Sequence, residues 1–288
     1  MRRYKAFKEL NLSNYFLFPA VMEDQELCRD MLEICTGETI GQVQVHTEEN
    51  RQYHPQKRAL RLDVKAWNAG ANYNAEMQNA RKQQLPKRSR YHQSMEDVLS
   101  LANGRDFMEL CENYVIFICT FDPFHGGKYR YIYENLSREE KRYLGDGTHK
   151  IYLNTKGTND SEVPEALVHF LKYVEESTDR CAQRYGEDLF IQRLHQRVQT
   201  VKQNREKEEE YMLFGELLDE REEIGEKRGE IRGEKRGEKR GEIRGEKRGS
   251  DKIIRLVRKM MENGFSDEIS RLDEPEFLQE MLNRFDIK

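Results

Sequence analysis

The sequence lacks any long hydrophobic run. Of its 288 residues 36% are hydrophobic and the mean hydropathy is −0.96. The longest clean apolar run covers residues 115–119, whereas a membrane-spanning helix needs ~18 apolar residues. The basic N-terminus is not followed by an apolar segment, so no signal peptide is predicted. We therefore expect a cytoplasmic protein that does not enter a membrane.

Cysteine is scarce and scattered, and the motifs of several enzyme classes are missing. The five cysteines show no CxxC spacing and no histidine at ligand spacing, which disfavours zinc and favours free thiols in a reducing compartment. The seven histidines have no nucleophile partner at a recognisable spacing, which disfavours a Ser-His or Cys-His hydrolase. A G-x-x-x-x-G-K-[ST] loop is also absent, so no nucleotide cofactor is expected.

The net charge of −4 conceals a basic segment. Residues 51–92 contain ten Lys or Arg and only two acids, Asp63 and Glu76. Within that segment, residues 81–90 carry five basic residues and no acid. Neutralisation of phosphates dominates affinity for nucleic acid. We expect the basic segment to contact nucleic acid; the alternative is an ordinary solvated helix face.

Residues 225–249 repeat a Gly-Glu-Lys-Arg unit. They contain six Glu and ten Lys or Arg, with Ile231 and Ile243 replacing a lysine. Each glycine inside a helix costs ~1 kcal/mol relative to alanine, whereas each charged pair returns only tenths. The repeat has no apolar stripe, which disfavours a coiled coil. We expect a frayed helix or a disordered charged linker.

Hydrophobic periodicity predicts an α/β domain with a mixed sheet. The helical pattern covers 24–36 and 93–102, and a further helix is expected to be capped by Ser161 with Pro164 in its first turn. Strand patterns cover 42–46, 60–67, 73–78, 114–119 and 149–154. Beyond this domain, residues 194–201 predict an amphipathic helix. Segments 252–262 and 275–284 predict a small helical bundle or a helix-turn-helix.

Two carboxylates are expected to face each other across a hairpin. If Ala69 and Gly70 form a tight turn, Asp63 lies opposite Glu76 with Cβ atoms about 4.5–5.5 Å apart. Opposed carboxylates repel each other, and a bound divalent cation such as Mg²⁺ removes the conflict. Alternation places Gln78, Arg61 and Lys65 on the same polar face, while the other face is apolar.

The order of segments resembles a known nuclease family. Asp63, the hairpin and Glu76-Met77-Gln78 resemble the PD-(D/E)XK signature in an E-x-Q variant. The resemblance to the recombination-promoting nuclease (Rpn) branch, also called PD-(D/E)XK nuclease family transposase, covers roughly residues 10–175. Its segments are 12–18, 61–64, 73–78, 87–91, 114–118, 121–124 and 154–157. It implies a restriction-endonuclease-like αβββαβ core and a metal-dependent DNA endonuclease linked to recombination or mobile elements.

The resemblance also implies a catalytic set. Asp63 and Glu76 would hold Mg²⁺, or Mn²⁺, which would generate a hydroxide nucleophile and stabilise charge on the phosphate. Gln78 stands where the superfamily usually has lysine, and a neutral amide does not supply positive charge. Lys65 or Arg61, on the same face, is the hypothesised source of that charge. The predicted DNA-binding residues are Arg61, Arg81, Lys82, Lys87, Arg88, Arg90 and Tyr91.

Two departures from the family pattern leave alternatives open. Tyr15 stands where many relatives carry an acid, so a third metal carboxylate would be Glu9, Asp24 or Glu33. Together with Gln78, this departure favours the alternative of a degenerate nuclease fold that binds DNA or a protein without cutting. A double-strand cut would favour a homodimer.

The composition predicts four regions along the chain. These are a nuclease-like domain at 1–185, a helical charged connector at 186–224, the repeat linker at 225–249 and a helical C-terminal segment at 250–288.

Overall fold

The computed structural model describes residues 5–51, 60–81 and 84–287, without the side chains of 48–51, 60, 61, 218, 221 and 222. The chain divides into two compact units, Met1–Leu213 and Phe214–Lys288. Each unit is described by itself. No helix in the described part of the chain is long and apolar enough to cross a membrane.

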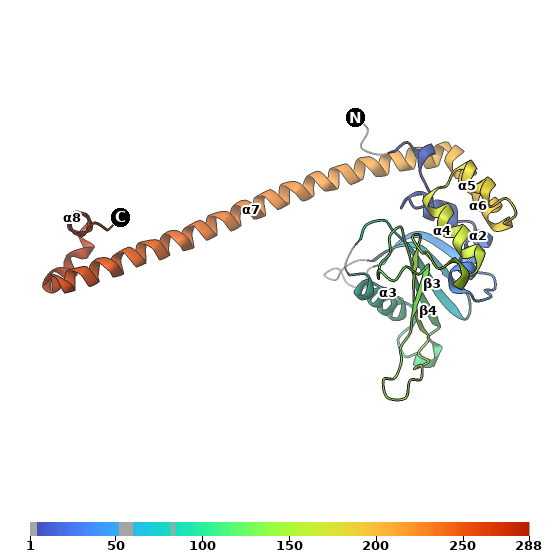
Figure 1. Ribbon diagram of the computed structural model, residues 1–288, viewed down its shortest axis with the longest axis horizontal. Coiled ribbons are helices and arrows are strands. Elements are labelled where there is room, and N and C mark those ends of the chain that lie inside the picture. Colours follow the sequence, from blue (N-terminus) through green and yellow to red (C-terminus); the bar gives the residue numbers. More distant parts are fainter. Residues whose placement is uncertain (1–4, 52–59, 82–83, 288) are drawn as a thin grey trace. The chain divides into compact units, whose positions relative to one another are not determined.

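The first unit is built on a six-stranded mixed sheet (Figure 1). The strands are β1 (Gln44–Arg51), β2 (Leu60–Trp67), β3 (Ala71–Gln78), β4 (Glu112–Cys119), β5 (Arg130–Tyr133) and β6 (Thr148–Asn154). Their order in the sheet is β1-β2-β3-β4-β6-β5. The central β3-β4-β6 pairs are parallel and the outer pairs are antiparallel. This arrangement confirms the predicted mixed sheet and αβββαβ core.

Helices cover both faces of the sheet. The α-helices of this unit are α1 (Leu17–Met22), α2 (Gln25–Thr36), α3 (Leu85–Ser100), α4 (Glu165–Glu175), α5 (Asp179–Arg184) and α6 (Leu189–Gln203). Short 3-10 turns lie at η1 (Phe7–Glu9), η2 (Phe107–Glu109) and η3 (Asp160–Glu162). Helix α3 lies on one side of the sheet, and α2 and α4 lie on the other (Figure 1).

Local signals explain where most of these elements begin and end. Asp24 caps α2 by accepting from the N–H of Leu27 at 3.0 Å, and Gly37 ends it at φ 85°. The strand predicted at 60–67 is β2, and the helix predicted at 24–36 is α2, which begins one residue later. Strand β1 runs from Gln44 to Arg51, later than the predicted 42–46.

Two predicted helices begin at other residues in the structure, and one strand was not predicted. Helix α3 begins at Leu85 instead of residue 93, because Pro86 in its first turn favours helix initiation. Helix α4 begins at Glu165 with Pro164 as N-cap, because Ser161 lies in the separate turn η3. Strand β5 was not predicted; it has only four residues, too few for an alternating pattern to stand out.

The β2–β3 hairpin has the predicted register. Val64 pairs with Ala75 and Trp67 with Asn72, so each pair of positions follows from a two-residue turn. The turn is fastened by Asn68, whose Oδ1 accepts from the N–H groups of Gly70 and Ala71, both at 2.9 Å. One face of the hairpin is apolar and packed; its buried members are Leu62, Val64, Ala66, Tyr73, Ala75 and Met77.

The second unit is helical. Helix α7 (Arg205–Glu262) runs into it from the first unit, and η4 (Ser266–Asp273) and α8 (Pro275–Arg284) follow. Leu256, Met260, Phe277 and Met281 form its buried core. The repeat at 225–249 is helical throughout, where a frayed helix or a linker was expected. Glu, Lys and Arg occupy most non-glycine positions and favour helix, and helix on both sides removes the cost of nucleation.

Candidate functional site

The two carboxylates of the hairpin lie where β2 and β3 begin to separate. Beyond the Val64–Ala75 pair, side chains replace backbone pairing: the N–H of Met77 donates to Asp63 Oδ2 at 2.9 Å, and the N–H of Asp63 donates to Glu76 Oε1 at 3.3 Å. Asp63 is half-buried, whereas Glu76 is only 1% exposed. The structure therefore brings Asp63 and Glu76 together as the hairpin register requires.

Helix α3 covers the polar face of the hairpin with a polar stripe. Arg88, His92 and Glu96 follow each other at intervals of four residues, so they project from one side of the helix. His92 and Glu96 are 0% and 2% exposed. The predicted polar face is therefore a buried layer between sheet and helix instead of an open surface.

Arg88 connects three members of this layer. Its Nη2 donates to Glu76 Oε2 at 2.8 Å, its Nη1 donates to Gln78 Oε1 at 2.6 Å, and its Nε donates to His92 Nε2 at 3.2 Å. The guanidinium also lies over the ring of Phe117, 5.2 Å from its centroid. All three nitrogens of the guanidinium are thus engaged, and Gln78 is held by an arginine.

His92 is the neutral member of the layer. Burial, followed by the charge of Arg88, lowers the pKa of His92 to about 3. The Nε2 of His92 accepts from Nε of Arg88 at 3.2 Å, and its Nδ1 lies 2.8 Å from Nδ2 of Asn74. His92 therefore orients Arg88 without adding a second positive charge beside it.

Lys65 has a different partner from the carboxylate pair. Its Nζ lies 2.6 Å from Glu96 Oε2, and the two side chains are 9% and 2% exposed. A buried ammonium is stable in this place because the opposite charge of Glu96 compensates it. The positive charge of Lys65, which was hypothesised to act in catalysis, is thus compensated by the carboxylate of Glu96 on α3.

The predicted DNA-binding residues separate into exposed and inward-facing groups. Arg81, Lys87 and Arg90 are exposed, whereas Arg88 points to Glu76. Tyr91 is half-buried and packs on the small cluster around Leu62 and Met95. Lys82 and the side chain of Arg61 lie outside the described residues.

The candidates for a third metal carboxylate serve other purposes or lie at the surface. Asp24 caps α2, and Glu33 Oε1 accepts from the N–H of Ile40 at 2.7 Å. Glu9 is exposed in η1. Across the residues that the structure describes, no group of three or more His, Cys, Asp or Glu could hold a metal ion.

Two adjacent carboxylates still fit the needs of Mg²⁺. This ion is usually held by one or two carboxylates, with waters and substrate phosphates completing its shell. Asp63 and Glu76 supply two such groups, tied together by the hydrogen bonds between their strands. These two side chains are therefore the described residues that could hold such an ion.

Sequence reasoning missed His92, Glu96 and the inward role of Arg88. The signal that could have found them was the spacing of four residues between positions 88, 92 and 96, in a helix that has Pro86 in its first turn. The basic character of residues 81–90 predicts an exposed surface and does not indicate that Arg88 faces inward.

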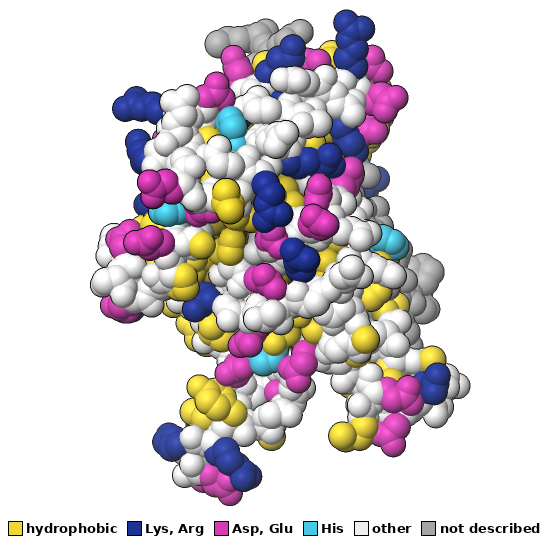
Figure 2. Space-filling model, turned by 90° about the vertical axis from the view of Figure 1, so that its right-hand side faces the viewer, with side chains coloured by type: hydrophobic (Ala, Val, Ile, Leu, Met, Phe, Trp, Pro, Cys, Tyr) yellow, Lys and Arg dark blue, Asp and Glu magenta, His cyan; other side chains and the backbone are white. Residues whose placement is uncertain are grey.

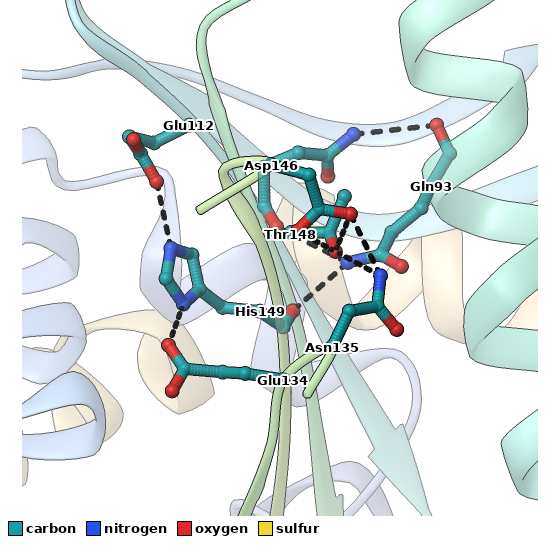
Figure 3. A network of polar contacts seen from close by, with 8 residues as sticks. Gln93, Glu112, Glu134, Asn135, Asp146, Thr148 and His149 are labelled. Atoms are coloured by element: carbon teal, nitrogen blue, oxygen red, sulfur yellow. Dashed lines mark hydrogen bonds and ion pairs between the residues drawn. The ribbon is translucent and has the colours of Figure 1, made fainter. Parts of the chain in front are cut away.

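A second polar network lies at the opposite end of the sheet (Figure 3). His149 Nδ1 lies 2.7 Å from Glu134 Oε1, and its Nε2 lies 2.7 Å from Glu112 Oε2. Both ring nitrogens are thus in contact with carboxylate oxygens. Gln93 of α3 donates to the backbone oxygens of Asn113 and His149, at 3.2 and 3.1 Å. This network connects β4, β6 and the chain after β5, and we interpret its role as structural.

Charge is mixed on the side of the unit away from α3. Figure 2 shows this side with acidic and basic side chains interspersed, without a broad field of one sign. Among the described residues, a group of basic side chains without acidic neighbours occurs instead at the start of α3 and in the segment before it. A surface for a polyanion is therefore expected near α3.

The fold and the carboxylate pair define a restriction-endonuclease-like protein. The family model of the PD-(D/E)XK nuclease family transposases matches residues 17–225, and the chain belongs to this family. No curated protein and no solved structure matches the chain significantly. The family links the chain to nucleases of mobile elements, which act on DNA and generally use divalent metals.

Proposed function

We propose that the protein is a metal-dependent DNA endonuclease that hydrolyses phosphodiester bonds, in a process linked to recombination or mobile elements. The observation that carries the proposal is the juxtaposition of Asp63 and Glu76 at the point where β2 and β3 separate. A purely structural hairpin gains nothing from two opposed carboxylates.

In this proposal the chain supplies ligands, orientation and charge. Asp63 and Glu76 hold Mg²⁺ or Mn²⁺, which when bound lowers the pKa of water and neutralises charge on the phosphate. The Nε2 of Gln78 donates to the backbone oxygen of Ala80 at 3.3 Å, and its Oε1 accepts from Arg88. We assign Gln78 to orienting Arg88 and the attacking water.

The DNA contact is proposed for the exposed basic residues around α3. Arg81, Lys87 and Arg90 are exposed, and Lys82 and Arg61 belong to the same proposal by sequence. Each phosphate contact that is lost should reduce the salt dependence of binding, measured as the slope of log affinity against log salt, by about one unit. Two copies of the chain would be needed for a double-strand cut.

A plasmid-nicking assay with Mg²⁺ tests the activity. Wild type should convert supercoiled plasmid to nicked or linear product, and Asp63→Ala and Glu76→Gln should reduce the rate at least about 100-fold, since metal ligands are lost. Glu139→Ala, which removes an exposed carboxylate in the loop after β5, is the matched control and should retain activity. Equal rates for wild type and Asp63→Ala would refute the enzyme proposal.

The second candidate is a nuclease fold that binds without cutting. Gln78 in the usual place of lysine favours it. Under this alternative the protein binds DNA with a strong salt dependence, and neither Mg²⁺ nor Mn²⁺ yields nicked product.

A further inference from the structure

We propose that Arg88 supplies the positive charge that Gln78 lacks and that its guanidinium competes with the divalent cation for Glu76. The proposal rests on the metal site of the proposed function. In the absence of metal, Arg88 is the counter-ion of Glu76; when metal binds, its Nη2 is released toward the phosphate of the substrate.

The first argument is the environment of Glu76. Its carboxylate is 1% exposed and lies 2.8 Å from Arg88 Nη2, so the guanidinium compensates a buried negative charge. Among the described cations, Lys65 has its own partner in Glu96, and Lys87 and Arg90 are exposed. Among the Lys and Arg side chains that the structure describes, the one in ion-pair contact with Glu76 is therefore Arg88.

The second argument is the way in which Arg88 is held. Gln78 fixes Nη1 and His92 fixes Nε. The Arg88 side chain is 35% exposed, so part of it remains open to solvent. A guanidinium that stays anchored at Nη1 and Nε when Nη2 leaves Glu76 is well placed for a phosphate, which matches its planar fork.

The third argument is electrostatic. A divalent cation on Glu76 and a guanidinium on the same carboxylate repel each other, so binding of one weakens binding of the other by the same factor. A phosphate relieves the conflict because it accepts both cations. Metal and substrate are thus expected to bind with positive cooperativity, with Arg88 as the residue that couples them.

Binding of Mn²⁺ to the full-length protein, measured by isothermal titration calorimetry without DNA, tests the competition. Arg88→Met should bind Mn²⁺ about tenfold more tightly than wild type, a difference of ~1.4 kcal/mol. Lys87→Met removes the same charge from the exposed neighbouring position and should bind as wild type does. An unchanged or weaker affinity in Arg88→Met would overturn the proposal.

A charge relocation provides a test that does not depend on Arg88→Met folding. Arg88→Gln alone should lower the nicking rate at least about tenfold, and Gln78→Lys combined with Arg88→Gln should restore much of it, because a cation returns to the same place. No restoration in a double variant that melts at the wild-type temperature would contradict the proposal.

Asp63→Ala distinguishes this proposal from the proposed function. If wild type binds Mn²⁺ and Asp63→Ala does not, while Arg88→Met matches wild type, only the role of Arg88 fails. If neither wild type nor Arg88→Met binds Mn²⁺, the metal site fails and the proposed function fails with it.

Discussion

At the scale of single residues, the layer between α3 and the hairpin is unusual because it is polar and almost inaccessible to solvent. Glu76, His92 and Glu96 are each at most 2% exposed. Glu76 is paired with Arg88 and Glu96 with Lys65, so each of these charges depends on a neighbour from another element. Removal of one partner is therefore expected to cost more than the pair contributes when intact.

The Lys65–Glu96 pair gives a measurable case. Lys65→Met leaves Glu96 buried without its counter-ion and should lower the free energy of unfolding by about 3–5 kcal/mol, measured by urea denaturation. The double variant Lys65→Met/Glu96→Met should recover most of the loss, because no charge is left unpaired. Additive losses in the double variant would contradict the coupling.

The same pair also tests the catalytic hypothesis for Lys65. Nicking activity that is unchanged in the folded double variant would rule out Lys65 as a source of positive charge in catalysis. The measurement is independent of Arg88, which keeps its contacts to Glu76 and Gln78.

At the scale of elements, the loop after β4 is organised by one carboxylate. Asp122 Oδ1 accepts from the N–H groups of Phe124 and His125 and from the hydroxyl of Tyr131, and Oδ2 accepts from the N–H of Gly127 at 2.7 Å. Burial alone would raise the pKa of Asp122, but these hydrogen bonds, that of Gly127 first, lower it. Asp122 thus has the structural role expected of a residue in a turn.

Asp122→Asn should destabilise the first unit in a pH-dependent way. The amide loses one acceptor oxygen, which should cost about 1–3 kcal/mol at pH 7. Because the folded pKa lies below the unfolded value of ~3.9, the advantage of wild type is full above that value and is lost as the pH falls through the folded pKa. Urea denaturation of both proteins between pH 3 and pH 7 measures this; a difference independent of pH would contradict it.

The loop after β6 is restricted by a close approach. A Cβ atom at Gly157 would lie 2.3 Å from Cγ of Tyr129, whose side chain is only 1% exposed. Gly157→Ala should therefore lower the free energy of unfolding by about 1–3 kcal/mol, as expected for overpacking. Gly41→Ala, where a Cβ meets no atom within 4 Å, is the matched control and should change it by less than about 0.5 kcal/mol.

The sequence predicted elements whose signals are local and missed those that depend on distant partners. The register of β2 and β3 follows from the two-residue turn, and α2 follows from Asp24 and Gly37 at its ends. The start of α3 was misplaced because its buried face is largely polar, so apolar periodicity does not reveal it. Its buried residues include Ser89, His92, Gln93 and Glu96.

The candidate site was likewise predicted where its signals are local and missed where they depend on packing. Asp63, Glu76, Gln78 and Lys65 share a strand pair, so alternation alone places them on one face. The direction of Arg88 depends on how α3 packs across the sheet, and a basic run in a sequence gives no information on which of its members turns inward.

At the scale of the whole molecule, the two units differ in how their helices are supported. The helices of the first unit pack on the sheet or on each other. A Cβ atom at any of the seven glycines from Gly225 to Gly249 meets no atom within 4 Å, and the side chains of the repeat are exposed. The repeat is therefore helical through local interactions alone.

Hydrogen exchange should separate the two kinds of helix. Peptides from 225–249 should exchange within seconds to minutes, whereas peptides from β4 should stay protected for far longer, because opening β4 requires global unfolding. Replacing Gly229, Gly233, Gly237 and Gly241 by alanine should slow exchange in the repeat, because each replacement stabilises the helix by about 1 kcal/mol. Protection of the repeat equal to that of α3 would show that it has a tertiary partner.

The two-residue turn at Ala69-Gly70 also determines which changes of length the protein tolerates. Strand β3 is held by its parallel pairing with β4, so an insertion at the turn must be absorbed by β2. One extra residue there would turn Asp63 to the apolar face and Leu62 to the polar one. Two extra residues would restore the faces but move Asp63 away from Glu76. The proposed chemistry therefore depends on a count of residues as much as on their identity, and this turn should be among the least tolerant places for insertion in the chain.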